Sequence, residues 1–385
     1  MSVTAAKGFT AAGIAAGIKA SGKADLALVV NTGPGRAAAG VFTSNRVKAA
    51  PVLWSEQVLK GGAVTAVVLN SGGANACTGP QGFQDTHATA EKAAEVLGHS
   101  AGEIAVASTG LIGVLLPMDK LLPGVAAAAA ELSEHGGEKA ALAIKTTDTV
   151  HKTAVATGPG GAWVVGGMAK GAGMLAPGLA TMLVVLTTDA DVDAGTLDKA
   201  LRDATRQTFD RVDSDGCMST NDTVLLLASG ASGTTPEYGD FADAVRAVCA
   251  DLARQLIGDA EGAAKDIKVE VVNAATEEDA VEVGRSIARN NLLKCAIHGE
   301  DPNWGRVLSA IGTTGAAFEP DRLNVAINGV WVCRNGSVGE DRDLVDMRFR
   351  EVVVTADLAA GDRSAVIWTN DLTADYVHEN SAYSS

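Results

Sequence analysis

Short runs of mainly apolar residues recur along the chain and predict β-strands. Most of these runs lack an alternation of polar and apolar positions, which is typical of strands covered on both faces. The runs are residues 24–30, 66–70, 103–109, 162–167, 181–188, 223–229, 267–273, 323–333, 351–358 and 364–371. The pattern therefore predicts sheets that are buried between other layers.

Apolar positions at helical spacing separate many of these runs. The predicted helices are residues 85–97, 125–134, 194–208, 241–257 and 276–291. The last of them begins with Thr276 and Asp279, a suitable capping pair for a helix N-terminus. The order of strands and helices predicts a layered α/β or α+β fold with late hairpins in the C-terminal quarter.

Composition narrows the possible partners. The chain has 385 residues, of which 47% are hydrophobic, enough for a large core and for two or three domain-sized units. A net charge of −15 disfavours nucleic acid and anionic membrane surfaces. The uncharged stretch 171–188 is broken by glycine and proline, and the first residues are interrupted by Lys7 and Lys19, so we expect neither a membrane helix nor a signal peptide. A small-molecule substrate fits better.

Neither a metal nor a cofactor is expected. The five cysteines are scattered without a C-x-x-C pair, which indicates no disulfide framework or zinc site and favours a reducing cytoplasm. No two histidines have metal-binding spacing, and the Asp213–Asp215 start of a calcium-like loop lacks the later ligands. The glycine-rich segments 33–40 and 157–162 lack the residues of a phosphate loop or a dinucleotide fingerprint.

One segment of the sequence suggests a catalytic nucleophile. In residues 168–189 a loop rich in glycine and proline leads to Thr181 at the head of an apolar strand. A threonine hydroxyl is a poor nucleophile without a neighbouring base, and its own α-amine, freed by cleavage of the preceding bond, can serve as one. Ala180 is small and leaves room for attack on its carbonyl. Spacing alone does not exclude the alternative that Thr181 merely opens a strand.

The run KGAGMLAPGLATML resembles the self-processing segment of ornithine acetyltransferases. Further stretches that resemble this family are residues 70–79, 108–113, 118–120, 146–149, 166–174, 219–230, 259–262, 299–306 and 380–385, so the resemblance covers essentially the whole chain. The sequence departs from the family at Gly178, where Ser or Asn is frequent, and around Cys217 and Met218.

The resemblance implies an α-β-β-α sandwich of the N-terminal-nucleophile type with a smaller C-terminal α/β portion. It implies self-cleavage between Ala180 and Thr181 into an α chain of residues 1–180 and a β chain of residues 181–385. An assembly of two copies of each chain, a heterotetramer, is also implied.

The same resemblance implies the site. Thr181 is the nucleophile, and the Thr109 hydroxyl and the Gly110 amide form the oxyanion hole. The implied substrate-binding residues are Thr146, Lys170, Thr181, Glu261, Asn380 and Ser385. Without the resemblance, Thr109–Gly110 would be interpreted as a turn and Lys170 as a surface lysine. Glu261 would be a charged residue near a helix end, and Asn380 and Ser385 would be residues of a disordered tail.

The implied activity is glutamate N-acetyltransferase: acetyl passes from N-acetylornithine to glutamate through acetyl-Thr181, in arginine biosynthesis and without a cofactor. Alternatives are a bifunctional enzyme that also uses acetyl-CoA, an amidase or aminopeptidase in which water accepts the acyl group, and a non-enzymatic metabolite-binding protein. The motifs do not separate a primary from a specialised pathway.

Two distinctive strings receive a structural interpretation. In NSGGANACTG, Gly72 and Gly73 suit a tight turn and Cys77 is expected to be buried. In DPNWGR, Trp304 is expected to serve packing.

Overall fold

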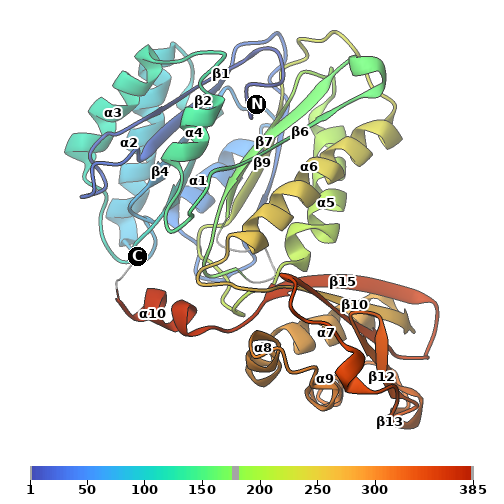
Figure 1. The fold of residues 1–385 in the computed structure, drawn as a ribbon. Helices are drawn as coiled ribbons and strands as arrows, with labels where there is room; N and C mark the ends of the chain where they lie inside the picture. The colour runs from blue at the N-terminus through green and yellow to red at the C-terminus, as the bar shows by residue number, and fades with distance from the viewer. Residues whose placement is uncertain (1, 176–181, 383–385) are drawn as a thin grey trace. The chain divides into compact units, whose positions relative to one another are not determined.

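Two β-sheets stacked between helices form the first of two units in the computed structural model, which describes residues 2–175 and 182–382 (Figure 1). The first unit comprises the described residues up to 210 together with 217–256, and the second comprises 211–216 and 257–382. The chain therefore enters the second unit briefly before returning to complete the first.

The first sheet of this unit has four strands in the order β1-β2-β4-β5, and the second has five in the order β3-β9-β8-β7-β6. The strands are β1 (Phe9–Ile14), β2 (Leu26–Asn31), β3 (Ala38–Phe42), β4 (Ala66–Ser71), β5 (Ile104–Thr109), β6 (Lys152–Thr157), β7 (Val164–Lys170), β8 (Leu183–Thr188) and β9 (Thr223–Ala228). The pairs β4–β5 and β8–β9 are parallel, and the other pairs are antiparallel.

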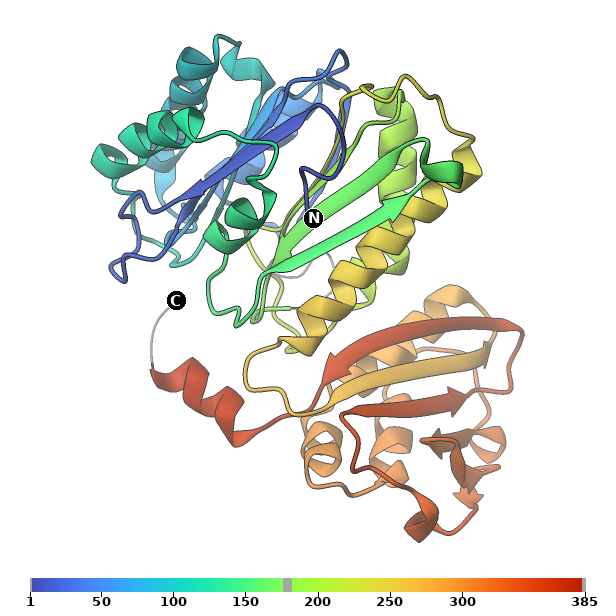
Figure 2. The same ribbon diagram turned by 45° about the horizontal axis from the view of Figure 1, so that its top comes forward.

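Helices cover the outer face of each sheet (Figures 1 and 2). They are α2 (Gly79–Leu97) and α3 (Met118–Ala130) on the four-stranded sheet, and α5 (Ala194–Gln207) and α6 (Tyr238–Gly258) on the five-stranded sheet. Helices α1 (Ala50–Leu59) and α4 (Gly137–Ala143) contribute side chains to the core between the sheets. Helices α2 and α3 share a core with the four-stranded sheet, and residues of both sheets, such as Val29 and Val185, share a second core between them. The predicted α-β-β-α sandwich is confirmed.

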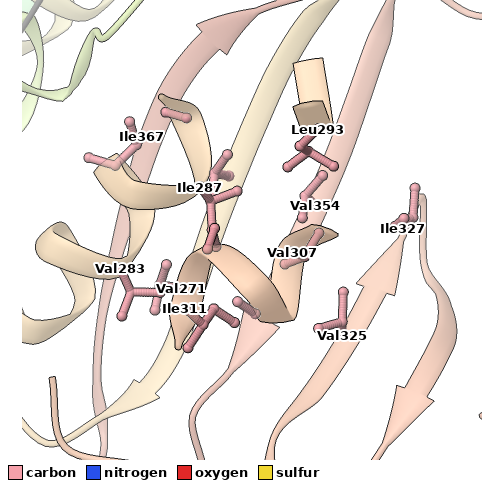
Figure 3. Close-up of a cluster of buried hydrophobic side chains, with 14 of the residues drawn as sticks. Val271, Val283, Ile287, Leu293, Val307, Ile311, Val325, Ile327, Val354 and Ile367 are labelled. Carbon is pink, nitrogen blue, oxygen red and sulfur yellow. The ribbon is translucent and has the colours of Figure 1, made fainter. Parts of the chain in front are cut away.

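The second unit is a six-stranded sheet in the order β13-β12-β11-β14-β10-β15. Its elements are β10 (Asp266–Ala274), β11 (Asn324–Ile327), β12 (Val330–Arg334), β13 (Ser337–Val338), β14 (Glu351–Asp357), β15 (Arg363–Asn370), α7 (Glu277–Ala288), α8 (Asn291–His298), α9 (Trp304–Ile311) and α10 (Ala374–Ala382). Aliphatic side chains of α7, α8 and α9, such as Ile287, Leu293 and Val307, share a core with strand residues such as Val271 (Figure 3). This unit is the predicted smaller C-terminal α/β portion.

Local sequence signals explain several of these elements. Strands β2, β4, β5, β8 and β9 are buried at every position, as their continuous apolar runs predict. The Thr276 hydroxyl accepts a hydrogen bond from Asp279 N, which confirms the predicted cap of α7. The apolar run 323–333 forms two strands, because Asn328 and Gly329 both have positive φ and turn the chain into the β11–β12 hairpin, as the late hairpins predicted from the sequence require.

Within the described part of the chain, no helix combines the length and the apolar character that crossing a bilayer requires.

Candidate active site

Thr109 and Gly110 lie at the end of β5, where the neighbouring loop holds their backbone. The amides of Gly72 and Gly73 both donate to Thr109 O, at 2.9 and 3.0 Å. Gly110 has a φ of +131°, and a Cβ at this position would lie 2.6 Å from Gly73 N. Only glycine fits such a close approach of two backbones. The Gly72–Gly73 turn expected from the sequence therefore holds the backbone of the two residues that are predicted to form the oxyanion hole.

Lys170 ends β7 and is buried, with 2% of its surface exposed. Its Nζ donates to Thr109 Oγ1 at 3.1 Å, so the structure brings these two predicted site residues together. An ammonium has only donors, and the threonine oxygen therefore accepts here and keeps its own proton for donation to another group. Strand β7 pairs with β8 so that Lys170 lies opposite Leu183, two residues after Thr181 in the chain.

Asp148, which the sequence did not indicate as a site residue, connects Thr146 with the backbone after Lys170. Its Oδ1 accepts from Lys152 Nζ and from Gly171 N, both at 2.6 Å, and its Oδ2 accepts from Thr146 N at 3.0 Å. Burial by itself would raise the pKa of Asp148, but the charges of Lys170 and Lys152 and the Gly171 amide outweigh burial and lower the pKa to about 2. Asp148 thereby links the backbone of Thr146 to the residue after Lys170.

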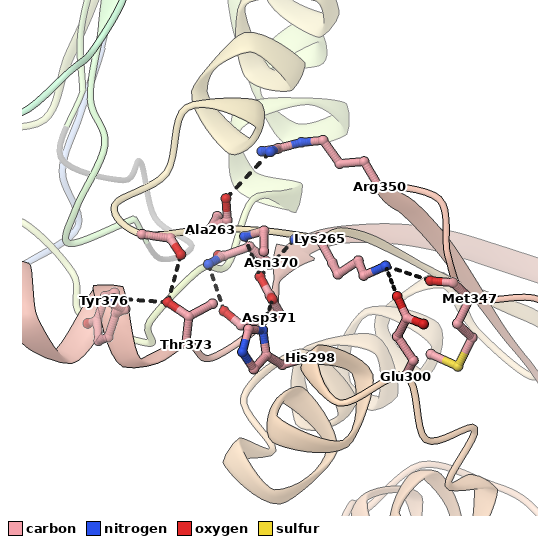
Figure 4. A network of polar contacts seen from close by, with 12 residues as sticks. Ala263, Lys265, His298, Glu300, Met347, Arg350, Asn370, Asp371, Thr373 and Tyr376 are labelled. Atoms are coloured by element: carbon pink, nitrogen blue, oxygen red, sulfur yellow. Dashed lines mark hydrogen bonds and ion pairs between the residues drawn. The ribbon is translucent and has the colours of Figure 1, made fainter.

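Glu261 and Asn380 meet in the second unit although 119 positions separate them in the sequence. Asn380 Nδ2 donates to Glu261 Oε2 at 3.0 Å. Thr373 explains the approach, because its hydroxyl donates to Gly262 O at 2.7 Å and accepts from Tyr376 N at 2.9 Å (Figure 4). The first turn of α10 is thereby fixed on the segment that carries Glu261.

A second anchor holds the same segment. Asp371 Oδ1 accepts from the amides of Ala264 and Lys265, each at 2.9 Å, and its Oδ2 lies 2.8 Å from His298 Nδ1 (Figure 4). At Gly262 a Cβ would lie 2.2 Å from Tyr376 N, so this position requires glycine. The glycine of the DAEG motif thus allows the close contact that brings Asn380 to Glu261.

Three predicted residues, Ala180, Thr181 and Ser385, lie outside the described residues. The neighbour of Thr181 in the chain is described: Met182 N donates to Asp222 Oδ1 at 3.0 Å. Asp222 is fully buried, and burial raises its pKa well above the usual value, although the Met182 amide and the charge of Lys170 act in the opposite direction.

The remaining sequence predictions have mixed outcomes. Trp304 packs against the core of the second unit, as expected. The expected burial of Cys77 is wrong, because this residue has a φ of +56° in the turn before α2 and its side chain is exposed. No group of three or more metal-ligating His, Cys, Asp or Glu side chains occurs among residues 2–175 and 182–382.

The arrangement in the first unit suits chemistry that develops negative charge. The buried ammonium of Lys170 orients the Thr109 hydroxyl. The amide of Gly110 comes next in the chain, and the amides of Gly72 and Gly73 hold the backbone carbonyl between them. Donors that are oriented before the reaction stabilise an oxyanion by roughly 3 kcal/mol each.

Comparisons with known proteins give a consistent result. The sequence profile of the ArgJ family matches residues 10–385. The chain is 84% identical over 385 residues to the arginine biosynthesis bifunctional protein ArgJ of Streptomyces coelicolor, and 64% identical over 385 residues to that of Thermobifida fusca; both alignments cover 100% of each chain. A solved ornithine acetyltransferase of Mycobacterium tuberculosis, complexed with ornithine, matches at 60% identity, covering 47% of this chain and 96% of that one with a TM-score of 0.45.

Proposed function

This chain belongs to the ArgJ family, and we propose on this basis that it transfers acetyl from N-acetylornithine to glutamate with Thr181 as the nucleophile. Its full-length relatives carry the name arginine biosynthesis bifunctional protein, which places the acyl transfer in amino-acid biosynthesis. The observation that supports the site most strongly is the buried contact of 3.1 Å between Lys170 Nζ and Thr109 Oγ1.

The active chain arises by self-cleavage. Thr181 Oγ attacks the carbonyl carbon of Ala180, the bond from that carbon to the Thr181 nitrogen breaks, and the nitrogen takes a proton and becomes a free amine. Water then hydrolyses the resulting ester and releases residues 1–180 from residues 181–385. The new α-amine is the general base that the hydroxyl otherwise lacks.

Acetyl transfer follows in two steps. Thr181 Oγ attacks the acetyl carbonyl of N-acetylornithine while the α-amine accepts the hydroxyl proton, and the developing oxyanion is stabilised by the Thr109 hydroxyl and the Gly110 amide. Ornithine leaves with that proton and acetyl-Thr181 remains. The α-amine of glutamate then attacks the ester, loses a proton to the Thr181 oxygen, and leaves as N-acetylglutamate.

The substrate-binding residues match an amino-acid substrate. Such a substrate carries an amine and a carboxylate, which require an anion, a cation and neutral hydrogen-bonding groups. Glu261 supplies the anion, Lys170 the cation, and Thr146, Asn380 and Ser385 the neutral groups. The contact between Glu261 and Asn380 supports the pairing of these two residues in one subsite.

Product analysis tests the proposal. Purified protein with N-acetylornithine and glutamate should form ornithine and N-acetylglutamate in equal amounts, and without glutamate ornithine release should stop after a single turnover. Sustained release of ornithine and acetate without glutamate would instead assign a hydrolase. Glutamate with acetyl-CoA as the sole donor tests the second activity, which the word bifunctional in the relatives' names favours.

We further propose that two copies of each processed chain assemble in the cytoplasm. Native mass spectrometry should give the mass of this heterotetramer, and a species containing one copy of each chain would contradict it.

A further inference from the structure

The motif STNDT, residues 219–223, is polar and almost completely buried. The exposed fractions of Ser219, Asn221, Asp222 and Thr223 are 2, 4, 0 and 2%. Polar side chains are seldom buried together unless they make specific hydrogen bonds. The proposed chemistry does not use any of these side chains, so their burial requires another explanation.

Asn221 binds the strand end that carries Thr109. Its Nδ2 donates to Ser108 O at 2.8 Å and to Ala74 O at 2.6 Å. Ser108 directly precedes Thr109, and Ala74 directly follows the Gly72–Gly73 turn that holds Thr109 O. One side-chain amide therefore connects both backbone segments that shape the oxyanion hole.

Asp222, the next residue, binds the backbone of Met182. Its Oδ1 accepts from Met182 N at 3.0 Å, and Thr223 N donates to Met182 O at 3.1 Å. Met182 follows Thr181 in the chain, so the amide held by Asp222 belongs to the peptide bond directly after the nucleophile. The STNDT loop is itself fixed, because Thr43 N donates to Asp222 O at 3.0 Å and Thr43 Oγ1 donates to Ser219 O at 2.7 Å.

Full burial of the Asp222 carboxyl is costly, although the Ser219 and Thr43 hydroxyls lie close enough to lower its pKa. Among the described residues its Oδ2 has no hydrogen-bond partner. Leaving a buried polar atom unpaired costs about 1–3 kcal/mol, and such atoms in native proteins call for an explanation such as a functional role.

We propose that Asn221 and Asp222 are positioning residues for the Thr181 reaction, and that their consecutive side chains hold the amide after the nucleophile and the strand end carrying Thr109 in a fixed relation. The inference rests on the proposed function. Its physical basis is preorganisation, since the oxyanion donors act only if the attacking oxygen is held within about 0.5 Å of the productive position.

The test compares Asp222→Ala and Asp222→Asn with a matched control. Asp189 lies directly after the opposite end of β8, has 2% exposure, and accepts backbone hydrogen bonds from Val164 N at 2.7 Å and Lys7 N at 3.2 Å. Asp189→Ala therefore also removes a buried carboxyl that binds backbone amides, but the length of β8 separates it from Met182. Intact mass gives the fraction cleaved, steady-state assays of the cleaved fraction give kcat and KM, and thermal unfolding gives Tm.

Asp222→Ala should slow self-cleavage and lower kcat about 10²-fold, while the KM for N-acetylornithine changes by less than about threefold. Asp222→Asn keeps an oxygen acceptor for Met182 N in a neutral side chain, and should return kcat to within about tenfold of wild type. Asp189→Ala should lower Tm and leave kcat unchanged.

Two outcomes would overturn the inference: a kcat for Asp222→Ala as high as that of Asp189→Ala, or an Asp222→Asn variant as slow as Asp222→Ala. If Asp222→Ala does not fold, Asn221→Ala decides, because an unchanged kcat there contradicts the role and a lowered kcat at constant KM supports it. A wild-type protein that neither cleaves nor transfers acetyl would refute the proposed function itself, which is a different result.

Discussion

Replacing Lys152 by methionine tests whether the buried charges beside Thr146 and Lys170 stabilise the first unit. Lys152 Nζ lies 2.6 Å from Asp148 Oδ1, and neither side chain is exposed. Methionine has a similar length without the charge. The substitution therefore leaves the Asp148 carboxylate buried with Lys170 and the backbone amides as its remaining stabilising groups.

The expected loss follows from the burial of both partners. Removing one partner of a buried ion pair destabilises by about 3–5 kcal/mol. Because Gly171 N still donates to Asp148 Oδ1 at 2.6 Å, we expect the lower end, about 3 kcal/mol. For a unit of this size the loss corresponds to a decrease in Tm of about 6–12 °C.

The pH dependence has a defined sign. The pKa of Asp148 in the folded protein, about 2, lies below the ordinary value of 3.8, so ionisation of Asp148 stabilises the fold above about pH 4, and this contribution is lost as the pH falls toward 2. Urea unfolding of Lys152→Met and wild type at pH 7 and at pH 3 measures both effects, with Asp148→Asn/Lys152→Met as the control that removes both charges. A loss below about 1 kcal/mol at pH 7, or a double variant no more stable than Lys152→Met, would refute the reasoning.

Three other variants test the oxyanion hole, the pH dependence of stability and the core of the second unit. Thr109→Val keeps the side-chain shape without the hydroxyl, and should lower kcat about 10²- to 10³-fold in the acetyl-transfer assay. Burial raises the pKa of Asp213 to about 6 despite the nearby Arg289, so its ionisation destabilises the fold as the pH rises from about 4 to 6; Asp213→Asn should flatten Tm across that interval. Ile287 is fully buried in the core shown in Figure 3, and Ile287→Ala should lower the unfolding free energy in urea by about 2–5 kcal/mol.

The sequence predicted the elements whose signal is local. Strands β4 and β8 are buried on both faces and read as continuous apolar runs, and α5 and α7 combine helical periodicity with a capping residue, Asp193 or Thr276. Strands β1, β3 and β6 were missed, because their small residues and threonines give no strong pattern. Their pairing partners, rather than their own composition, determine that they are strands.

The site shows the same division. The family resemblance indicated Thr109 and Lys170, which are hydrogen-bonded although 61 positions separate them in the sequence. It also indicated Glu261 and Asn380, which are hydrogen-bonded across a separation of 119 positions. The motifs that contain Asp148 and Asp222 were recognised, but neither carboxyl was assigned a role. Their roles depend on contacts distant in the sequence, such as Asp222 with Met182, and on burial that no local pattern reveals.

Intact mass spectrometry of wild type, Thr181→Ala and Thr181→Ser, before and after incubation with N-acetylornithine, tests the central claim most directly. Wild type should consist of residues 1–180 and 181–385, and only the second chain should gain the mass of one acetyl group. Thr181→Ala should remain a single inactive chain, and Thr181→Ser should retain some cleavage because it keeps a hydroxyl. An active wild-type protein in which residues 180 and 181 are still joined, or a cleaved Thr181→Ala variant, would contradict the account.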